Sequence, residues 1–182
     1  MSTKDRILDV AESLFNELGY TAVGVDLIRD KAQVSKTSMY RHFGSKSKLI
    51  DAVLIRRHQR FEKELGEAVD SAHDEKDKLD AILNWHFNWF KSTTFQGCMF
   101  MHGLAEFKGH DEQLAQRAQE HKVWLKQVIL SIFGQNASHR EASAEAIMAL
   151  LEGMIIRAEF GKAVGYEDIY RHSAHLLAST AS

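Results

Sequence analysis

The chain contains no proline among its 182 residues. Proline disrupts a helix interior because it lacks the backbone N–H and its ring clashes with the preceding turn. The strong helix formers alanine, leucine, glutamate, lysine and glutamine are frequent in the same chain. We therefore predict an all-α fold built from uninterrupted helices.

Apolar residues recur at helical spacing along most of the chain and predict about nine helices. The expected ranges are 3–18, 25–32, 35–43, 45–72, 78–90, 98–107, 111–133, 138–160 and 167–179. A tight turn at Gln33 and Val34 joins the second short helix to the third, which indicates a helix-turn-helix unit. Ser138 and Glu141 match a capping box and predict the start of the eighth helix.

The charge of the chain is unevenly distributed. Residues 1–60 contain 11 Lys and Arg against 7 Asp and Glu, whereas residues 61–182 contain 12 against 18. A basic front and an acidic rear indicate that only the front meets a polyanion. The change falls within the predicted helix 45–72, so we expect a helix, rather than a flexible loop, to connect two domains.

Three lysines lie in the first turns of the third and fourth predicted helices, namely Lys36, Lys46 and Lys48. A cation is mildly unfavourable there because the N-terminal end of a helix dipole is positive. The placement makes sense if an anion such as phosphate binds at these ends. For a single lysine a solvated surface is the simpler interpretation, but for the cluster, with its neighbours at 40–42, we favour nucleic acid.

The remaining composition limits the compartment in which the protein works. A single cysteine excludes an internal disulfide framework and fits a reducing cytosol. The first nine residues are too polar for a signal peptide, and no apolar run is long enough to cross a bilayer. We expect a soluble, cytoplasmic protein.

The segment from Ile7 to Phe61 resembles the N-terminal domain of the TetR family of bacterial transcriptional regulators. The resemblance rests on A-E-S-L-F-N-E-L-G-Y at 11–20, V-D-L-I at 25–28 and V-S-K-T-S-M-Y-R-H-F-G-S-K-S-K-L at 34–49. Two positions depart from the family pattern: Gly24 replaces a usual Ser or Thr, and Gln33 replaces a frequent turn glycine.

The resemblance implies a homodimeric repressor that binds a palindromic DNA operator and releases it when a small-molecule effector binds. A DNA-binding domain would occupy residues 1–48 and continue into the connecting helix 45–72. Residues 73–182 would form an effector-binding and dimerisation domain.

By motif match, the start of the third helix would read base edges through Lys36, Thr37 and Ser38, whereas Tyr40, His42 and Lys46 would hold phosphates. Arg41 is open between bases and backbone. The chemistry of these side chains agrees with base contacts. Lysine can donate to the acceptor atoms of guanine, and a hydroxyl can either donate to a base or accept from it.

The second domain is rich in aromatic, methionine and histidine side chains that either form its core or line an apolar effector pocket. The pocket itself is implied by the resemblance, with a small, apolar or aromatic effector. The candidate lining residues are His86, Trp89, Phe90, Cys98, Met101, His102, Trp124 and Arg157.

Cys98 and His102 share a helix face, so the imidazole could activate the thiol of an oxidant or electrophile sensor. The alternative is a buried, inert cysteine. A cysteine enzyme is a weaker possibility because no third residue orients the pair, and we predict no catalytic residue. His172 and His175 suggest a metal pair, but no third ligand is evident, so we predict neither a metal nor a cofactor.

The last two predicted helices alternate small and large apolar residues, which suits packing between two protomers in a four-helix arrangement. The candidate interface residues are Ile147, Leu151, Met154, Ile155, Tyr170, Ala174 and Leu177. The alternative is that they close the core of one chain. A helical adaptor that does not bind DNA is the remaining rival to a regulator.

Overall fold

The structure is a computed structural model that describes residues 2–161 and 165–181. Within these residues it contains nine α-helices and no strand, which confirms the predicted all-α class. The helices are α1 (Thr3–Leu18), α2 (Val25–Ala32), α3 (Lys36–Phe43), α4 (Lys46–Asp70), α5 (Glu75–Phe90), α6 (Met99–Phe107), α7 (Glu112–Leu130), α8 (Arg140–Glu159) and α9 (Glu167–Ser179).

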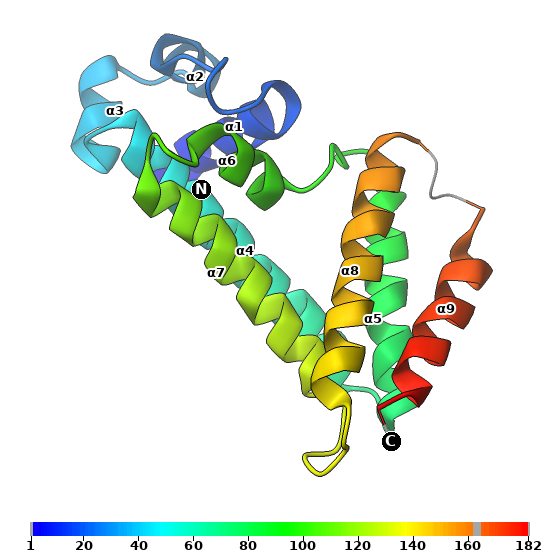
Figure 1. Cartoon of the computed structure of the whole chain (residues 1–182). Coiled ribbons are helices and arrows are strands. Elements are labelled where there is room, and N and C mark those ends of the chain that lie inside the picture. The colour runs from blue at the N-terminus through cyan, green and yellow to red at the C-terminus, as the bar shows by residue number, and fades with distance from the viewer. Residues whose placement is uncertain (1, 162–164, 182) are drawn as a thin grey trace. The chain divides into compact units, whose positions relative to one another are not determined.

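The chain divides into two compact units, which we call unit 1 and unit 2. Unit 1 comprises residues 1–59 and 98–121, and unit 2 comprises residues 60–97 and 122–182. Unit 1 therefore holds α1, α2, α3 and α6, unit 2 holds α5, α8 and α9, and α4 and α7 contribute to both (Figure 1). The segment 98–121, which the sequence analysis placed in the effector domain, packs with the N-terminal helices.

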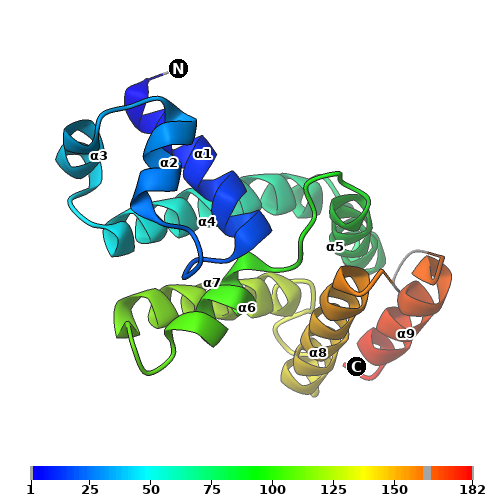
Figure 2. The same cartoon turned by 90° about the horizontal axis from the view of Figure 1, so that it is seen from above.

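Unit 1 is organised around the apolar stripe of α1. The helix begins with a capping box in which the Ser2 hydroxyl accepts the Asp5 N–H, and the Asp5 carboxylate accepts the Ser2 N–H. Figure 2 shows α2 and α3 following α1 at one end of α4. The stripe and the residues that it meets are buried: Ile7, Ala11, Phe15, Ile28, Ala32, Met39, Phe43, Leu49 and Val53.

A buried ionic cluster also joins α1 to α4. Glu12 is only 7% exposed, and its carboxylate accepts hydrogen bonds from Arg56 at 2.8 Å and from Arg57 at 3.1 Å. Asp9 accepts a further bond from Arg56 at 2.6 Å. Breaking a buried pair of this kind is costly, so the cluster fixes the register of α1 on α4.

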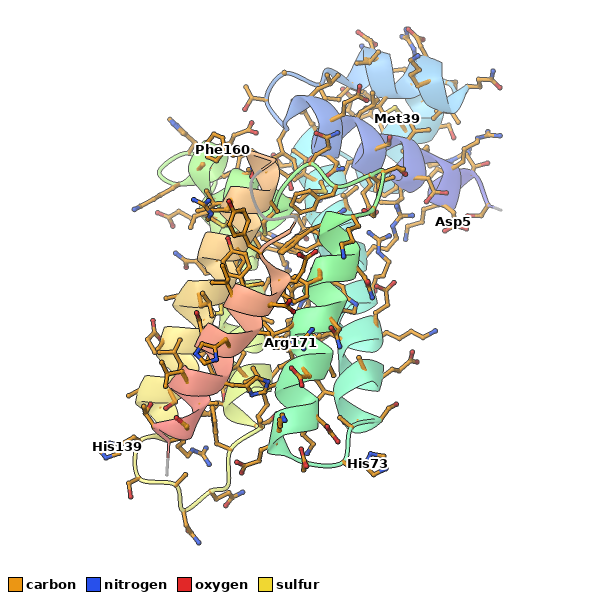
Figure 3. All side chains as sticks on the ribbon, turned by 90° about the vertical axis from the view of Figure 1, so that its right-hand side faces the viewer. Asp5, Met39, His73, His139, Phe160 and Arg171 are labelled. Atoms are coloured by element: carbon orange, nitrogen blue, oxygen red, sulfur yellow. The ribbon has the colours of Figure 1, made fainter. Side chains whose placement is uncertain are left out.

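Unit 2 is built on the packing of α8 against α5 and α9, which lie side by side in Figures 1 and 2. Its buried apolar residues include Leu79, Ile82, Leu83, Ile147, Leu151 and Met154. Figure 3 shows Arg171 of α9 directed toward α5, where the Asp80 carboxylate accepts hydrogen bonds from Arg171 and, at 2.9 Å, from His175. Salt bridges from Lys122 and Lys126 connect α7 to α8.

Two helix starts differ from the sequence predictions by two residues or more. Helix α5 begins at Glu75, three residues earlier than expected, because the Asp74 carboxylate accepts the Asp77 N–H at 2.8 Å and caps the helix. The capping box predicted at Ser138 is wrong: α8 is capped by His139 with no side-chain bond. There the His139 N–H bonds to the Ala181 carbonyl at 3.2 Å, so a long-range contact fixes this start.

Candidate functional site

The α2–α3 segment forms the predicted helix-turn-helix. Gln33 ends α2 in the left-handed conformation (φ 52°), and the N–H of Val34 bonds to the Arg29 carbonyl at 3.2 Å. Met39 and Phe43 of α3 are 4% and 8% exposed, so this face of the helix is anchored in unit 1. The opposite face of α3 is consequently turned to solvent.

The exposed face of α3 carries the residues that were predicted to contact DNA. The Ser35 hydroxyl caps the helix by accepting the Ser38 N–H at 3.1 Å. The first turn contains no acidic residue. Lys36, Thr37, Tyr40, Arg41 and His42 are exposed, and Ser38 is half-buried. The exposed face of α3 is therefore basic and rich in hydroxyl groups, and we call it the α3 surface.

Lys36 of this surface and Lys46, at the start of α4, already have partners within the chain. Lys36 forms an ion pair with Asp26 of α2 at 3.4 Å, and both side chains are more than half exposed. Such exposed pairs are weak, so Lys36 can exchange Asp26 for a phosphate or a base at little cost. Lys46 is half-buried, and its ammonium donates to the Thr21 carbonyl at 3.3 Å. Burial lowers the pKa of Lys46, against the opposing effect of the Glu106 carboxylate.

Helix α6 is held to the turn that follows α1 by polar contacts that the sequence did not predict. The Tyr20 hydroxyl donates to the Met99 carbonyl at 2.8 Å, and the Glu106 carboxylate accepts the backbone N–H groups of Tyr20 and Thr21. The rings of Phe15 and Phe107 lie 5.3 and 5.2 Å from that of Tyr20. Tyr20 and Thr21 are 79 to 86 positions from their hydrogen-bond partners Met99 and Glu106, so no local pattern in the sequence predicts the pairing.

The predicted effector residues fall into both units. In unit 2 the structure brings His86, Trp89 and Phe90 together: the His86 ring centroid lies 6.3 Å from that of Trp89 and 6.2 Å from that of Phe90. Phe95 extends this aromatic cluster, with its centroid 4.9 Å from that of Trp89. Trp124 is half-buried, whereas Arg157 is exposed and donates to the Tyr170 hydroxyl at 3.1 Å.

His86 is a buried, neutral member of the aromatic cluster. It is 1% exposed, and its Nδ1 lies 2.8 Å from the Ile82 carbonyl. Burial lowers the pKa of His86 to about 4, helped by the positive charge of Lys122 and opposed by the hydrogen bond to Ile82. Because Nδ1 then carries the proton that it donates, Nε2 is the acceptor side of the ring.

In unit 1 the other three candidates lie at the start of α6. Cys98 is the N-cap of that helix and is 3% exposed, and Met101 and His102 are half-buried. A buried thiol is the environment of an inert cysteine rather than a reactive one. Among residues 2–161 and 165–181, no group of three or more His, Cys, Asp or Glu side chains is arranged to hold a metal ion.

The predicted dimer residues are mostly covered within the chain itself. Five of them are at most 2% exposed: Ile147, Leu151, Met154, Ile155 and Ala174. These five pack the core of unit 2 and offer no surface to a second copy, so their assignment is corrected. Tyr170 and Leu177 are half-buried. The large exposed hydrophobic residues of the same region are Ile156, Phe160, Tyr166, Ile169 and Leu176, with Phe160 at the end of α8 in Figure 3.

The helix-turn-helix segment matches a known family. The family model described as bacterial regulatory proteins, tetR family, matches residues 7–53. The chain is 33% identical over 88 residues to the HTH-type transcriptional activator FasR of Mycolicibacterium smegmatis, covering 48% of this chain and 40% of FasR. It is 28% identical over 106 residues to the HTH-type transcriptional repressor NemR of Escherichia coli, covering 57% of this chain and 53% of NemR.

The whole fold has counterparts among solved structures. A TetR-family transcriptional regulator from Streptomyces coelicolor superposes with a TM-score of 0.91 at 22% identity, covering 99% of this chain and 96% of that chain. The reduced form of Escherichia coli NemR superposes with a TM-score of 0.82 at 20% identity, covering 94% of each chain. At these identities the likeness shows the fold alone.

The family model matches the N-terminal part of the chain, from α1 into α4. The chain spans about half or less of the length of the curated relatives that it matches. Over the residues that the structure describes, every helix is too short or too polar to cross a membrane. The motif, the helix-turn-helix geometry and the family model together show that residues 7–53 carry the helix-turn-helix segment of the tetR family of bacterial regulatory proteins.

Proposed function

We propose that this chain is a cytoplasmic, ligand-responsive transcriptional repressor that binds a palindromic double-stranded DNA operator as a homodimer. The observation that carries the proposal is the α3 surface: an anchored helix whose solvent face presents Lys36, Thr37, Tyr40, Arg41 and His42. A recognition helix enters the major groove with its N-terminal residues toward base edges, and a symmetric dimer requires a symmetric site.

The proposed homodimer is supported by exposed apolar side chains of α8, α9 and the segment between them. Phe160 is 76% exposed, Leu176 62% and Ile169 60%, and apolar side chains that gather in one patch of a surface mark interaction sites. Covering them in a two-fold contact of α8 and α9 with a second copy would remove this apolar area from water.

The proposed effector is a small apolar or aromatic molecule that binds in unit 2. The cluster of Trp85, Trp89, Phe90 and Phe95 supports this class, because ring centroids 4.9 to 5.8 Å apart provide aromatic surfaces for stacking. His86 supplies one neutral hydrogen-bonding group within it.

Three variants test the proposed division between base and phosphate contacts. We expect Lys46→Ala and Tyr40→Phe to weaken binding to all DNA sequences by similar factors, because phosphates carry no sequence information. Lys36→Ala should reduce the preference for the operator over random DNA by about 5- to 100-fold, the value of one good base contact. Fluorescence anisotropy with a duplex from upstream of the gene and a random duplex measures both quantities.

Glu17→Gln provides the matched control, because Glu17 is an exposed residue of α1 outside the α3 surface. It should retain both the affinity and the preference of the wild type. If Lys36→Ala keeps the full preference for the operator, Lys36 does not read bases and the proposed division is wrong.

A further inference from the structure

The last turn of α6 supplies a carboxylate to the backbone of the turn that follows α1. Glu106 Oε1 accepts the Tyr20 N–H at 3.0 Å, and Glu106 Oε2 accepts the Thr21 N–H at 2.6 Å. Two successive backbone N–H groups thus bind the two oxygens of one carboxylate. Hydrogen bonds to an ionised acceptor are about twice as strong as neutral ones, so this contact holds the turn firmly.

The backbone of the turn is shaped to let the carboxylate approach. Gly19 ends α1 with φ +82°, and a Cβ added to it would lie only 3.0 Å from Glu106 Oε1. The positive φ therefore favours glycine here, and a Cβ would also require the Glu106 carboxylate to shift slightly.

The same turn holds a lysine of the proposed DNA surface. Thr21 donates its N–H to Glu106 and accepts the Lys46 ammonium on its carbonyl oxygen at 3.3 Å. Lys46 lies in the first turn of α4, immediately after the α3 surface. Thr21 therefore links the carboxylate of α6 to the position of the Lys46 ammonium.

We propose that Glu106 is a positioning residue for DNA binding, which fixes the Tyr20–Thr21 turn and, through Thr21, sets the ammonium of Lys46 for a phosphate contact. This inference rests on the proposed function. It assigns to α6, outside the helix-turn-helix, a direct part in shaping the DNA surface.

The negative charge of Glu106 means that a positioning role and a purely electrostatic role change DNA affinity in opposite directions. Desolvation on burial opposes ionisation, but the hydrogen bonds from Thr21 and Tyr20 outweigh it and lower the pKa of Glu106, so the group is anionic at neutral pH. Removing an anion near a DNA-binding surface strengthens binding if only its charge matters, because the surface becomes more positive. Removing a positioning residue weakens binding instead.

The experiment measures the affinity for a duplex from upstream of the gene by anisotropy, with folding checked by circular dichroism. We expect Glu106→Gln, which keeps the shape but loses the charge and one acceptor, to bind about tenfold more weakly. Glu106→Asp keeps the charge but has a side chain one methylene shorter, so it should also weaken binding. This variant replaces Glu106→Gln in the experiment if Glu106→Gln does not fold. Glu17→Gln removes one exposed charge from α1 and should bind as tightly as the wild type or slightly more tightly.

A double variant separates positioning from a general loss of structure. If Glu106 acts through Lys46, both changes remove the same contact, that of the Lys46 ammonium with a phosphate. The double variant Glu106→Gln with Lys46→Ala should then bind DNA no more weakly than Lys46→Ala alone. Additive losses, or a Glu106→Gln variant that binds as tightly as Glu17→Gln, would overturn the inference while the wild type still binds DNA. A wild type that shows no binding to the duplex would overturn the proposed function and this inference with it.

Discussion

Replacing Tyr20 by alanine is expected to destabilise the protein by about 3–5 kcal/mol, the usual cost of emptying the site of a buried aromatic ring. Tyr20 is fully buried, and its ring packs against Phe15 of α1 and Phe107 of α6. Alanine would leave a cavity between these two helices and also remove the hydrogen bond to the Met99 carbonyl. Urea unfolding at neutral pH, followed by circular dichroism, measures this loss as a shift of the transition midpoint.

Tyr20→Phe is the matched control because it keeps the ring and removes only the hydroxyl. Burial raises the pKa of Tyr20, so the hydroxyl is a donor at any working pH, and its loss should cost about 1 kcal/mol. If Tyr20→Ala costs no more than Tyr20→Phe, the ring does not fill a packed site between α1 and α6.

The second large effect is a loss of stability in acid that depends on His86. The unfolded chain binds a proton at His86 with an ordinary pKa of 6.5, whereas burial lowers the pKa in the folded chain to about 4. As the pH falls below 6.5, the unfolded state gains a proton that the folded state does not, so folding loses free energy until the pH reaches about 4. The loss from this group should be about 2 kcal/mol between pH 7 and pH 5.

His86→Gln removes the titrating group and retains an amide that can donate to the Ile82 carbonyl. We expect its free energy of unfolding to fall less between pH 7 and pH 5 than that of the wild type, by about 2 kcal/mol. His172→Gln, at an exposed position of α9, leaves His86 in place and should keep the wild-type dependence. The same slope in the wild type and His86→Gln would show that His86 is not held neutral by burial.

Local signals in the sequence were sufficient for most helices. Thr3–Leu18, Val25–Ala32 and Glu167–Ser179 are found at the predicted bounds, because their apolar stripes depend on neighbouring residues. Helix α8 shows the limit of such signals. Ser138 and Glu141 fit a capping box by spacing, but the bond from His139 to Ala181 sets the helix start, and local spacing carries no information about a residue 42 positions away.

The candidate site, like the helix bounds, could be predicted from the sequence only where local spacing decides the structure. The exposed face of α3 follows from the four-residue spacing of Met39 and Phe43, so the sequence predicted which side chains reach solvent. It did not predict that Lys36 pairs with Asp26 or that Glu106 binds the turn after α1, since both are tertiary contacts. An apolar stripe such as that of α8 likewise does not reveal whether its cover is another helix of the chain or a second copy.

Above all, we propose that the α3 surface and the first turn of α4 bind DNA through their cations. Lys36, Arg41 and Lys46 of two protomers would place about six cations against phosphates or bases, which predicts a roughly 10³-fold loss of affinity between 50 and 200 mM salt. The most direct measurement is the dissociation constant for a duplex from upstream of the gene, determined across this range. A steep linear fall of log affinity with log salt, made shallower by Lys46→Ala, is the result that we predict. Affinity that is absent at low salt, or that does not change with salt, would contradict the account.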